Sequence, residues 1–165
     1  MIEIRPLHKT DPVKAFRNFI CELIDENAYL LIDKKPTMKE EKAWLKDKLD
    51  GIRKSNVVFL TAWNGKKLIG LSDGFRGKWK DKQNVCLGIA VLKSYRGQGL
   101  GERLLNGIIK LAKQKLKPRI MYLSVAAPNK PALKLYKKIG FKTFARFPKW
   151  SNHRGKYIDT LYMKL

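Results

Sequence analysis

The chain of 165 residues has little of what marks secreted, metal-binding or membrane proteins. Its only cysteines, Cys21 and Cys86, are too few for a disulfide framework and have no metal-ligand spacing. No apolar run approaches the roughly 18 residues needed to cross a bilayer, and Met1 to Pro6 contain no apolar stretch of a secretory signal. We therefore expect no metal, no membrane association, two buried reduced thiols and a cytoplasmic location.

Acidic residues are also scarce. Fourteen Asp and Glu stand against 36 Lys and Arg, which leaves a formal net charge of +22. This field would attract polyanions. Three interpretations remain open: solvated surface lysines, a phosphorylated cofactor, or a basic face for nucleic acid or an acidic partner. The lysines are spread along the chain, and no zinc-finger or RNA-binding signature accompanies them, so charge alone does not name a function.

Two helices are expected in the first third of the chain. Asp11-Pro12 reads as an N-cap followed by proline at the first helical position, and the helical apolar pattern then continues to about Asp25. Thr37 to Glu40 is a capping box, in which the Thr37 hydroxyl and the Glu40 carboxylate each accept from the other's backbone. The second helix is expected to stop at Gly51.

After residue 56 the pattern changes toward β-branched and aromatic runs, which indicate strands. Asn64-Gly65 is a preferred two-residue hairpin turn. The expected strands are 2–5, 57–63, 67–75, 85–92, 120–126, 141–147 and 157–164, with later helices after 97–101 and over 130–139. Because helices interleave with strands and no repeat or interior linker is found, we expect one α/β domain over residues 1–165.

The most informative segment is the glycine-rich stretch from Val91 to Gly101, which follows a strand and opens a helix. In that context backbone N–H groups converge on an anion, and glycines let a pyrophosphate approach. A Walker loop would need Gly-Lys-Ser or Gly-Lys-Thr, whereas Gly101-Glu102-Arg103 stands here. A Rossmann fingerprint would need Gly-x-Gly-x-x-Gly in the first strand-helix unit. The segment is thus neither of these nucleotide-binding motifs.

The segment does resemble the pyrophosphate loop of the GNAT superfamily of acetyltransferases, Arg/Gln-x-x-Gly-x-Gly/Ala, at Arg96, Gly99 and Gly101. A second block, residues 123–141, is similar to the family's other cofactor segment, with Asn129, Ala132, Tyr136 and Gly140-Phe141 in place. The resemblance implies a three-layer α/β (α+β) GNAT fold, in which helices flank a mixed, mostly antiparallel central sheet with two splayed strands. It also implies acetyl-CoA as co-substrate.

The resemblance further implies the residues that meet acetyl-CoA. The backbone of Ile89 to Val91 would bind the acetyl carbonyl and the pantetheine amides, and the N–H of Val91 would act as the oxyanion donor. Arg96 to Gly101 would hold the pyrophosphate. The full cofactor set is Ile89, Ala90, Val91, Arg96, Gly97, Gln98, Gly99, Leu100, Gly101, Asn129, Ala132 and Tyr136.

Tyr136 is the candidate general acid beside the departing sulfur. A phenol of pKa about 10 gives its proton to a thiolate of pKa about 8.5 at a cost of roughly 2 kcal/mol, so a hydrogen bond to the sulfur is the better-supported role. The alternative is that Tyr136 only packs its helix. Many family members carry Glu at the position of Cys86, and this departure leaves the general base unassigned. A missing base favours α-amines over lysines, because an α-amine of pKa about 8 loses its proton more easily than a lysine of pKa about 10.4.

Acceptor specificity is expected from residues 25–35 and 146–156, with Glu26, Tyr29, Asp73 and His153 as candidate substrate residues. His153 is expected on a mobile loop. The enzyme hypothesis is N-acetyl transfer to a protein or peptide N-terminus or a small-molecule amine, by direct attack in a ternary complex. The alternative is a catalytically weak binding module of the same fold that engages nucleic acid or acidic partners. Oligomeric state is open, although the resemblance makes a homodimer an option.

Overall fold

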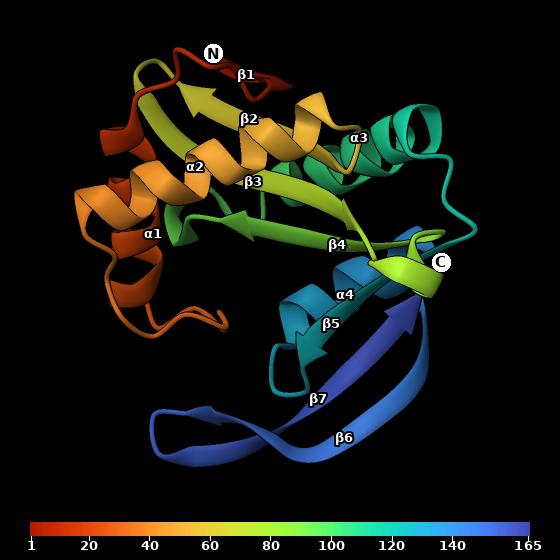
Figure 1. The fold of residues 1–165 in the computed structure, drawn as a ribbon. Coiled ribbons are helices and arrows are strands. Elements are labelled where there is room, and N and C mark those ends of the chain that lie inside the picture. Colours follow the sequence, from red (N-terminus) through yellow and green to blue (C-terminus); the bar gives the residue numbers. More distant parts are fainter.

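The computed structural model describes all residues from 1 to 165. Seven strands form one sheet in the order β1-β2-β3-β4-β5-β7-β6, and four α-helices pack against it (Figure 1). The strands are β1 Ile2–Pro6, β2 Val57–Asn64, β3 Lys67–Arg76, β4 Asn84–Val91, β5 Ile120–Ala126, β6 Lys142–His153 and β7 Lys156–Lys164. The helices are α1 Val13–Asp25, α2 Met38–Arg53, α3 Leu100–Lys115 and α4 Lys130–Ile139, with short 3-10 turns at Trp79–Asp81 and Lys93–Tyr95.

The sheet is antiparallel at every pairing except that of β4 with β5, which is parallel. Helices α1 and α2 cover one face of β2 and β3, while α3 and α4 lie on the opposite face (Figure 1). The expected mixed, mostly antiparallel sheet between two helical layers is therefore confirmed. No helix in the structure is both long enough and apolar enough to cross a membrane.

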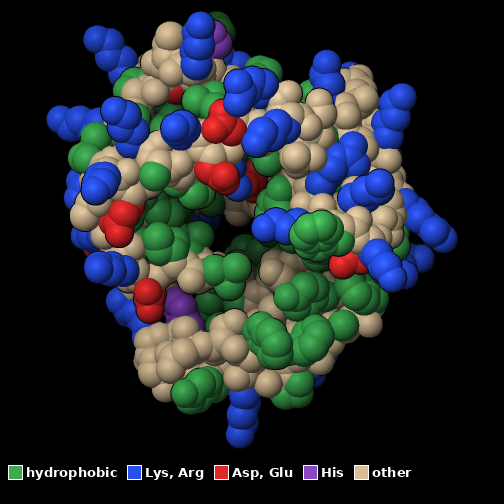
Figure 2. All heavy atoms as spheres, viewed as in Figure 1, with side chains coloured by type: hydrophobic (Ala, Val, Ile, Leu, Met, Phe, Trp, Pro, Cys, Tyr) green, Lys and Arg blue, Asp and Glu red, His purple; other side chains and the backbone are tan.

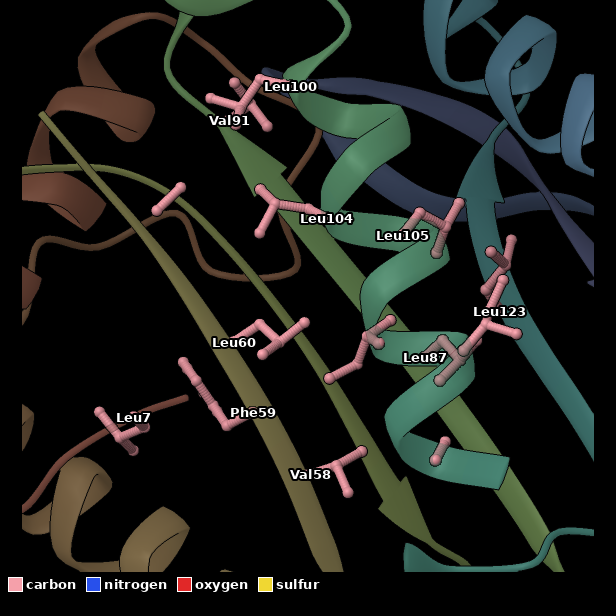
Figure 3. Packing of buried hydrophobic residues seen from close by; sticks show 14 of the residues in the cluster. Leu7, Val58, Phe59, Leu60, Leu87, Val91, Leu100, Leu104, Leu105 and Leu123 are labelled. Atoms are coloured by element: carbon pink, nitrogen blue, oxygen red, sulfur yellow. The ribbon is translucent and has the colours of Figure 1, made fainter. Parts of the chain in front are cut away.

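The core is centred on α3, whose apolar side chains face the sheet. Figure 3 shows Leu104 and Leu105 of this helix pointing toward Leu60, Leu87 and Leu123 of three different strands. Each of these five leucines is less than a tenth exposed. Truncating one buried leucine to alanine in such a core costs about 2 to 5 kcal/mol of unfolding free energy, so α3 holds the central strands in place.

The start of α1 differs from the prediction. Asp11 is not the N-cap; Pro12 occupies that position without a side-chain hydrogen bond. The Asp11 carboxylate instead pairs with Arg5, 2.6 Å away, and accepts from the backbone N–H of His8 at 2.8 Å. A charge-assisted pair to β1 thus takes the oxygen atoms that a cap would use. Helix α2 has the expected capping box but runs past Gly51 to Arg53.

The final hairpin is longer than the sequence indicates. Strand β6 continues to His153 instead of ending at Phe147, and a register shift between Phe147 and Ser151 interrupts its pairing with β7. The Asp159 carboxylate accepts from the backbone N–H of Lys149 at 2.9 Å and from the Arg146 side chain, which holds the irregular stretch together. His153 therefore ends a strand, and the prediction of a loop at that position is wrong.

Candidate functional site

The sheet is split between β4 and β5. Their parallel pairing covers only Asn84 to Cys86 against Ile120 to Tyr122. Beyond these residues the two strands diverge, while β4 stays paired with β3 and β5 with β7 (Figure 1). The carboxyl-terminal halves of β4 and β5 therefore border a gap, and the expected splayed strands are confirmed.

The gap exposes backbone groups of β4. The N–H of Leu92 donates to Ile69 of β3, and in an antiparallel pair the residues that bond to the neighbour alternate along the strand. Ile89 and Val91 consequently direct their N–H and C=O groups away from β3 and toward the gap. The Val91 carbonyl accepts from Nε of Arg96 at 2.8 Å, which agrees with this direction. The Val91 N–H therefore faces the space where the sequence predicts an acetyl carbonyl.

The loop after β4 has the geometry of an anion site. Gly97 and Gly99 have φ of +74° and +77°, and a Cβ atom at either residue would meet nothing within 4 Å. Gly99 is also the N-cap of α3, so the first backbone N–H groups of that helix have no carbonyl partner within it. Negative charge is stabilised at such a helix end. The open space and unpaired donors fit the pyrophosphate of acetyl-CoA.

Glu26, just after α1, holds this loop in place through two hydrogen bonds. Its carboxylate accepts from the backbone N–H of Lys93 at 2.8 Å and from the guanidinium of Arg96 at 2.7 Å. The Arg96 side chain, expected among the cofactor ligands, thus bonds to protein groups on both sides. Glu26, expected to contact the acceptor, joins α1 to the loop. The structure places both residues in one network around the start of the phosphate loop.

Helix α4 closes the gap near the phosphate loop. Asn129 is its N-cap and accepts from the N–H of Ala132 at 3.4 Å, and Leu135 lies 3.3 Å from the position that a Cβ of Gly101 would occupy. Tyr136 is 7% exposed, packs against Phe141, and has no hydrogen bond to its hydroxyl. Burial raises the pKa of Tyr136 to about 12. Its phenol therefore stays protonated near neutral pH and offers an uncommitted donor.

A second cavity lies on the face covered by α1 and α2. It has a volume of about 760 Å³, and its mostly apolar wall includes Phe19, Leu30, Trp44 and Leu71. Ile89 and Ala90 of β4 also line it, so the cavity reaches the strand that borders the gap. Figure 2 shows this face hollowed between the helices and the β6–β7 hairpin. We call this cavity the acceptor pocket.

A buried ion pair stands beside β4 at the acceptor pocket. The Asp73 carboxylate of β3 accepts from Nζ of Lys48 at 2.9 Å, and both side chains are mostly buried. Gly88 is opposite Asp73, and a Cβ there would lie 2.5 Å from Oδ1 of Asp73, so glycine makes room for the carboxylate. Sequence reasoning named Asp73 but missed Lys48 and Gly88. A glycine inside a strand was the available signal, since it often marks a close approach.

Cys86, where the resemblance would lead one to expect Glu, does not act as a base at neutral pH. Burial, and then the nearby Asp73 carboxylate, raise the pKa of its thiol to about 11. The thiol thus remains protonated at neutral pH. No group of three or more His, Cys, Asp or Glu side chains in the structure could hold a metal ion.

The two segments expected to set acceptor specificity meet in the structure. The rings of Tyr29 and His153 pack with their centroids 4.5 Å apart. Tyr29 follows α1, whereas His153 ends β6, so the contact joins the helical side of the hollow to the terminal hairpin. The predicted substrate residues therefore have different surroundings: Asp73 of β3 pairs with Lys48, Glu26 bonds to the loop after β4, and Tyr29 packs against His153.

The split sheet leaves a gap that ends at the N-terminus of α3, an arrangement suited to a phosphorylated ligand. Solved structures show the same fold. A GNAT-family acetyltransferase from Streptococcus pneumoniae superimposes with a TM-score of 0.88 at 24% identity, covering 100% of this chain and 99% of that one. A putative acetyltransferase from Salmonella typhimurium, solved with its cofactor acetyl-CoA, gives 0.86 at 20% identity, with 100% and 93% covered. At these identities the likeness shows the fold.

The family model described as the acetyltransferase (GNAT) family matches residues 19–141. The chain belongs to this family, whose members use acetyl-CoA as co-substrate, and both expectations from the sequence are confirmed. An N-alpha-acetyltransferase of Sulfurisphaera tokodaii is 43% identical over 61 residues, which is 37% of this chain. The match spans only 36% of that relative's length.

Proposed function

We propose that this protein transfers the acetyl group of acetyl-CoA to a primary amine, of a protein or peptide N-terminus or of a small molecule, by direct attack in a ternary complex. The observation that carries the proposal is the position of Ile89 and Ala90. They border the gap that ends at the phosphate loop, and they also line the acceptor pocket. A thioester in the gap and an amine in the pocket would thus meet at one segment of β4.

Each step of the reaction has a candidate group in the chain. Acetyl-CoA supplies an activated acetyl group and a sulfur leaving group. The N–H groups of residues 97 to 101 hold the pyrophosphate, and the N–H of Val91 donates to the acetyl oxygen as negative charge develops there. Tyr136 donates a hydrogen bond to the departing sulfur. With a pKa of about 12, it is a poor proton donor to a thiolate of pKa about 8.5, because full transfer would cost about 5 kcal/mol.

The amine must lose a proton before or during attack. Asp73 is the carboxylate at the β4 end of the pocket, and it accepts the proton directly or through water. Lys48 pairs with that carboxylate at 2.9 Å, and its positive charge disfavours a second positive charge nearby. An α-amine, with a pKa near 8, loses its proton at lower cost than a lysine side chain. The chain's similarity to an N-alpha-acetyltransferase agrees with this preference.

The rival hypothesis is a binding module that uses the +22 charge to engage nucleic acid. It explains neither the open phosphate loop nor the pocket that reaches β4. The enzyme hypothesis accounts for both features, and we favour it for that reason.

The first test is calorimetric titration of the protein with acetyl-CoA, CoA and ATP. We expect micromolar binding of both CoA species, weak binding of ATP, and loss of CoA binding in Gly99→Glu, which fills the space before the loop. Gly65→Glu is the matched control, because Gly65 also has positive φ and open space but lies in the β2–β3 turn. Absence of CoA binding in the wild type would refute the proposal. If CoA binds as expected, the next experiment is a screen of peptide and small-amine acceptors.

A further inference from the structure

Glu41 is a buried carboxylate without a partner in the wall of the acceptor pocket. It is 6% exposed and lines the pocket, yet no side-chain hydrogen bond or salt bridge reaches it. Most other charged residues around the pocket are engaged, although Lys34 also lines it and forms no ion pair. Lys48 pairs with Asp73, Lys35 pairs with Asp25, and Glu40 accepts from the Thr37 backbone within the capping box. Glu41 is therefore the one acidic side chain of the pocket that forms neither an ion pair nor a hydrogen bond.

Such a group is costly to the folded protein, because an ionised carboxylate loses hydration on burial. Burial raises the pKa of Glu41, and the Arg17 charge opposes this shift only in part. Arg17 forms no salt bridge with it; its Nε donates instead to the Pro36 carbonyl at 2.9 Å. A cationic group from outside the chain would supply the missing partner.

The position of Glu41 shows where that cation would lie. Glu41, Trp44 and Lys48 all line the pocket from α2, and Glu41 precedes Lys48 by seven residues, or about 10 Å along the helix. Lys48 contacts Asp73 beside β4, so Glu41 lies about two helical turns away from that contact along α2. Most of the residues that line the pocket are apolar, Phe16, Phe19 and Leu71 among them.

We infer that the acceptor is a primary amine with a second cationic group about 10 Å from the reacting nitrogen, joined to it by an apolar segment, and that Glu41 binds this second group. The inference rests on the proposed function for the assignment of the β4 end as the reacting end. The apolar wall accommodates the connecting segment by hydrophobic contact. The reacting amine lies beside the Asp73–Lys48 pair.

The charge distribution supports a dedicated cation site. A molecule of net charge +22 repels cationic ligands at long range, so binding them requires local carboxylates. Figure 2 shows acidic side chains along the rim of the hollow on a face otherwise rich in Lys and Arg. Glu40, Glu41 and Asp73 are the acidic residues that line the pocket itself.

The test compares binding of α,ω-diaminooctane and n-octylamine by calorimetry, in the wild type, Glu41→Gln and Asp47→Asn. Asp47 is the control, since it is an exposed carboxylate on the same helix. We expect the wild type to bind the diamine roughly 10-fold more tightly than the monoamine, as one charge-assisted hydrogen bond predicts. Glu41→Gln should remove this preference, leaving octylamine and acetyl-CoA binding unchanged, and Asp47→Asn should retain it.

Equal affinities of the wild type for the two ligands would overturn the inference. So would an equal loss for both ligands in Glu41→Gln, which would place Glu41 at the reacting nitrogen. Because binding is measured without turnover, the two failures can be told apart. A diamine that binds through Glu41 but is not acetylated would leave Glu41 as a cation site and overturn its assignment to the acceptor, whereas absence of CoA binding would refute the proposed function. Glu41→Gln is expected to unfold at or above the wild-type temperature, because it removes an unpaired buried charge.

Discussion

Tyr136 and Cys86 show how burial, at the scale of single residues, decides what the site can do. Both side chains titrate well above their usual range, with pKa values of about 12 and 11, and desolvation is the largest cause in each case. The tyrosine therefore remains a hydrogen-bond donor through the neutral and mildly alkaline range. The cysteine remains a neutral thiol. Neither residue supplies a base, which is consistent with the proposed role of Asp73.

Tyr136→Phe is expected to lower kcat by roughly 10- to 100-fold, because the sulfur loses a donor that acts mainly in the transition state. Acetyl-CoA affinity should change little, since the ring and its packing are retained. The ratio of wild-type to variant kcat should stay constant from pH 7 to pH 9, because a phenol of pKa about 12 does not ionise there. Steady-state kinetics with the best acceptor checks this. Unchanged turnover would remove Tyr136 from the mechanism.

Some site residues could be read from the sequence and others could not. Gly97, Gly99 and Tyr136 belong to motifs in which spacing itself carries the chemistry, so their positions were predictable. Glu41 and Lys48 lie in a helix rich in Lys, Glu and Asp, where charged side chains usually indicate a solvated face. Only the packing of α2 over β3 shows that one is buried without a partner and the other is paired with Asp73.

At the scale of elements, the site depends on how α1 meets the β4–α3 loop. Glu26, just after α1, is 14% exposed in its side chain and bonds to both Lys93 and Arg96. Arg96 in turn donates to the end of β4. The loop is thereby held from two sides before any ligand binds, and such preorganisation lowers the cost of binding.

Glu26→Gln should therefore weaken acetyl-CoA binding by about 5- to 10-fold, because Gln has no charge and only one acceptor oxygen, so it cannot accept from both Lys93 N–H and Arg96. Glu22→Gln is the matched control on the preceding turn, since Glu22 pairs with Lys67 at a more exposed position away from the loop. Calorimetric titration with acetyl-CoA measures both variants. If Glu26→Gln binds acetyl-CoA like the wild type, the contacts of Glu26 with Lys93 and Arg96 have no part in cofactor binding.

The elements themselves were largely predictable where local signals act alone. The Thr37 capping box forms as expected, with Glu40 accepting from Thr37 N–H at 2.7 Å. The errors arise where distant residues compete. Arg5 of β1 takes the Asp11 carboxylate that was expected to cap α1, and β7 pairing extends β6 through residues 148 to 153. In both cases the partner belongs to another strand, so a pattern within the element itself does not show the contact.

At the scale of the whole molecule, the buried thiol and phenol make stability sensitive to high pH. The unfolded chain releases these protons near pH 8.5 and 10, whereas the folded protein keeps them to about 11 and 12. Between those values the unfolded state binds fewer protons than the folded one. The contribution of each group therefore falls as pH rises from about 9 to 12.

A Cys86→Ala, Tyr136→Phe double variant should lose less stability than the wild type between pH 8 and pH 10.5. The difference is expected to be about 2 to 3 kcal/mol, most of it from Cys86, whose unfolded pKa is lower. Urea unfolding at the two pH values measures it, and the comparison cancels the titration of the many lysines. Equal losses of unfolding free energy in the two proteins would show that Cys86 and Tyr136 do not determine the loss of stability at alkaline pH.

The sequence by itself determined the family, the order of helices and strands, and the phosphate loop, because each of these depends on residues that are neighbours along the chain. Tertiary structure decided the rest. The split between β4 and β5, the Asp73–Lys48 pair against Gly88, the unpaired Glu41 and the contact of Tyr29 with His153 all join elements that are distant in sequence. The burial and pairing of charged side chains depend on which of them lie close together in the folded protein, and the local sequence pattern does not show this.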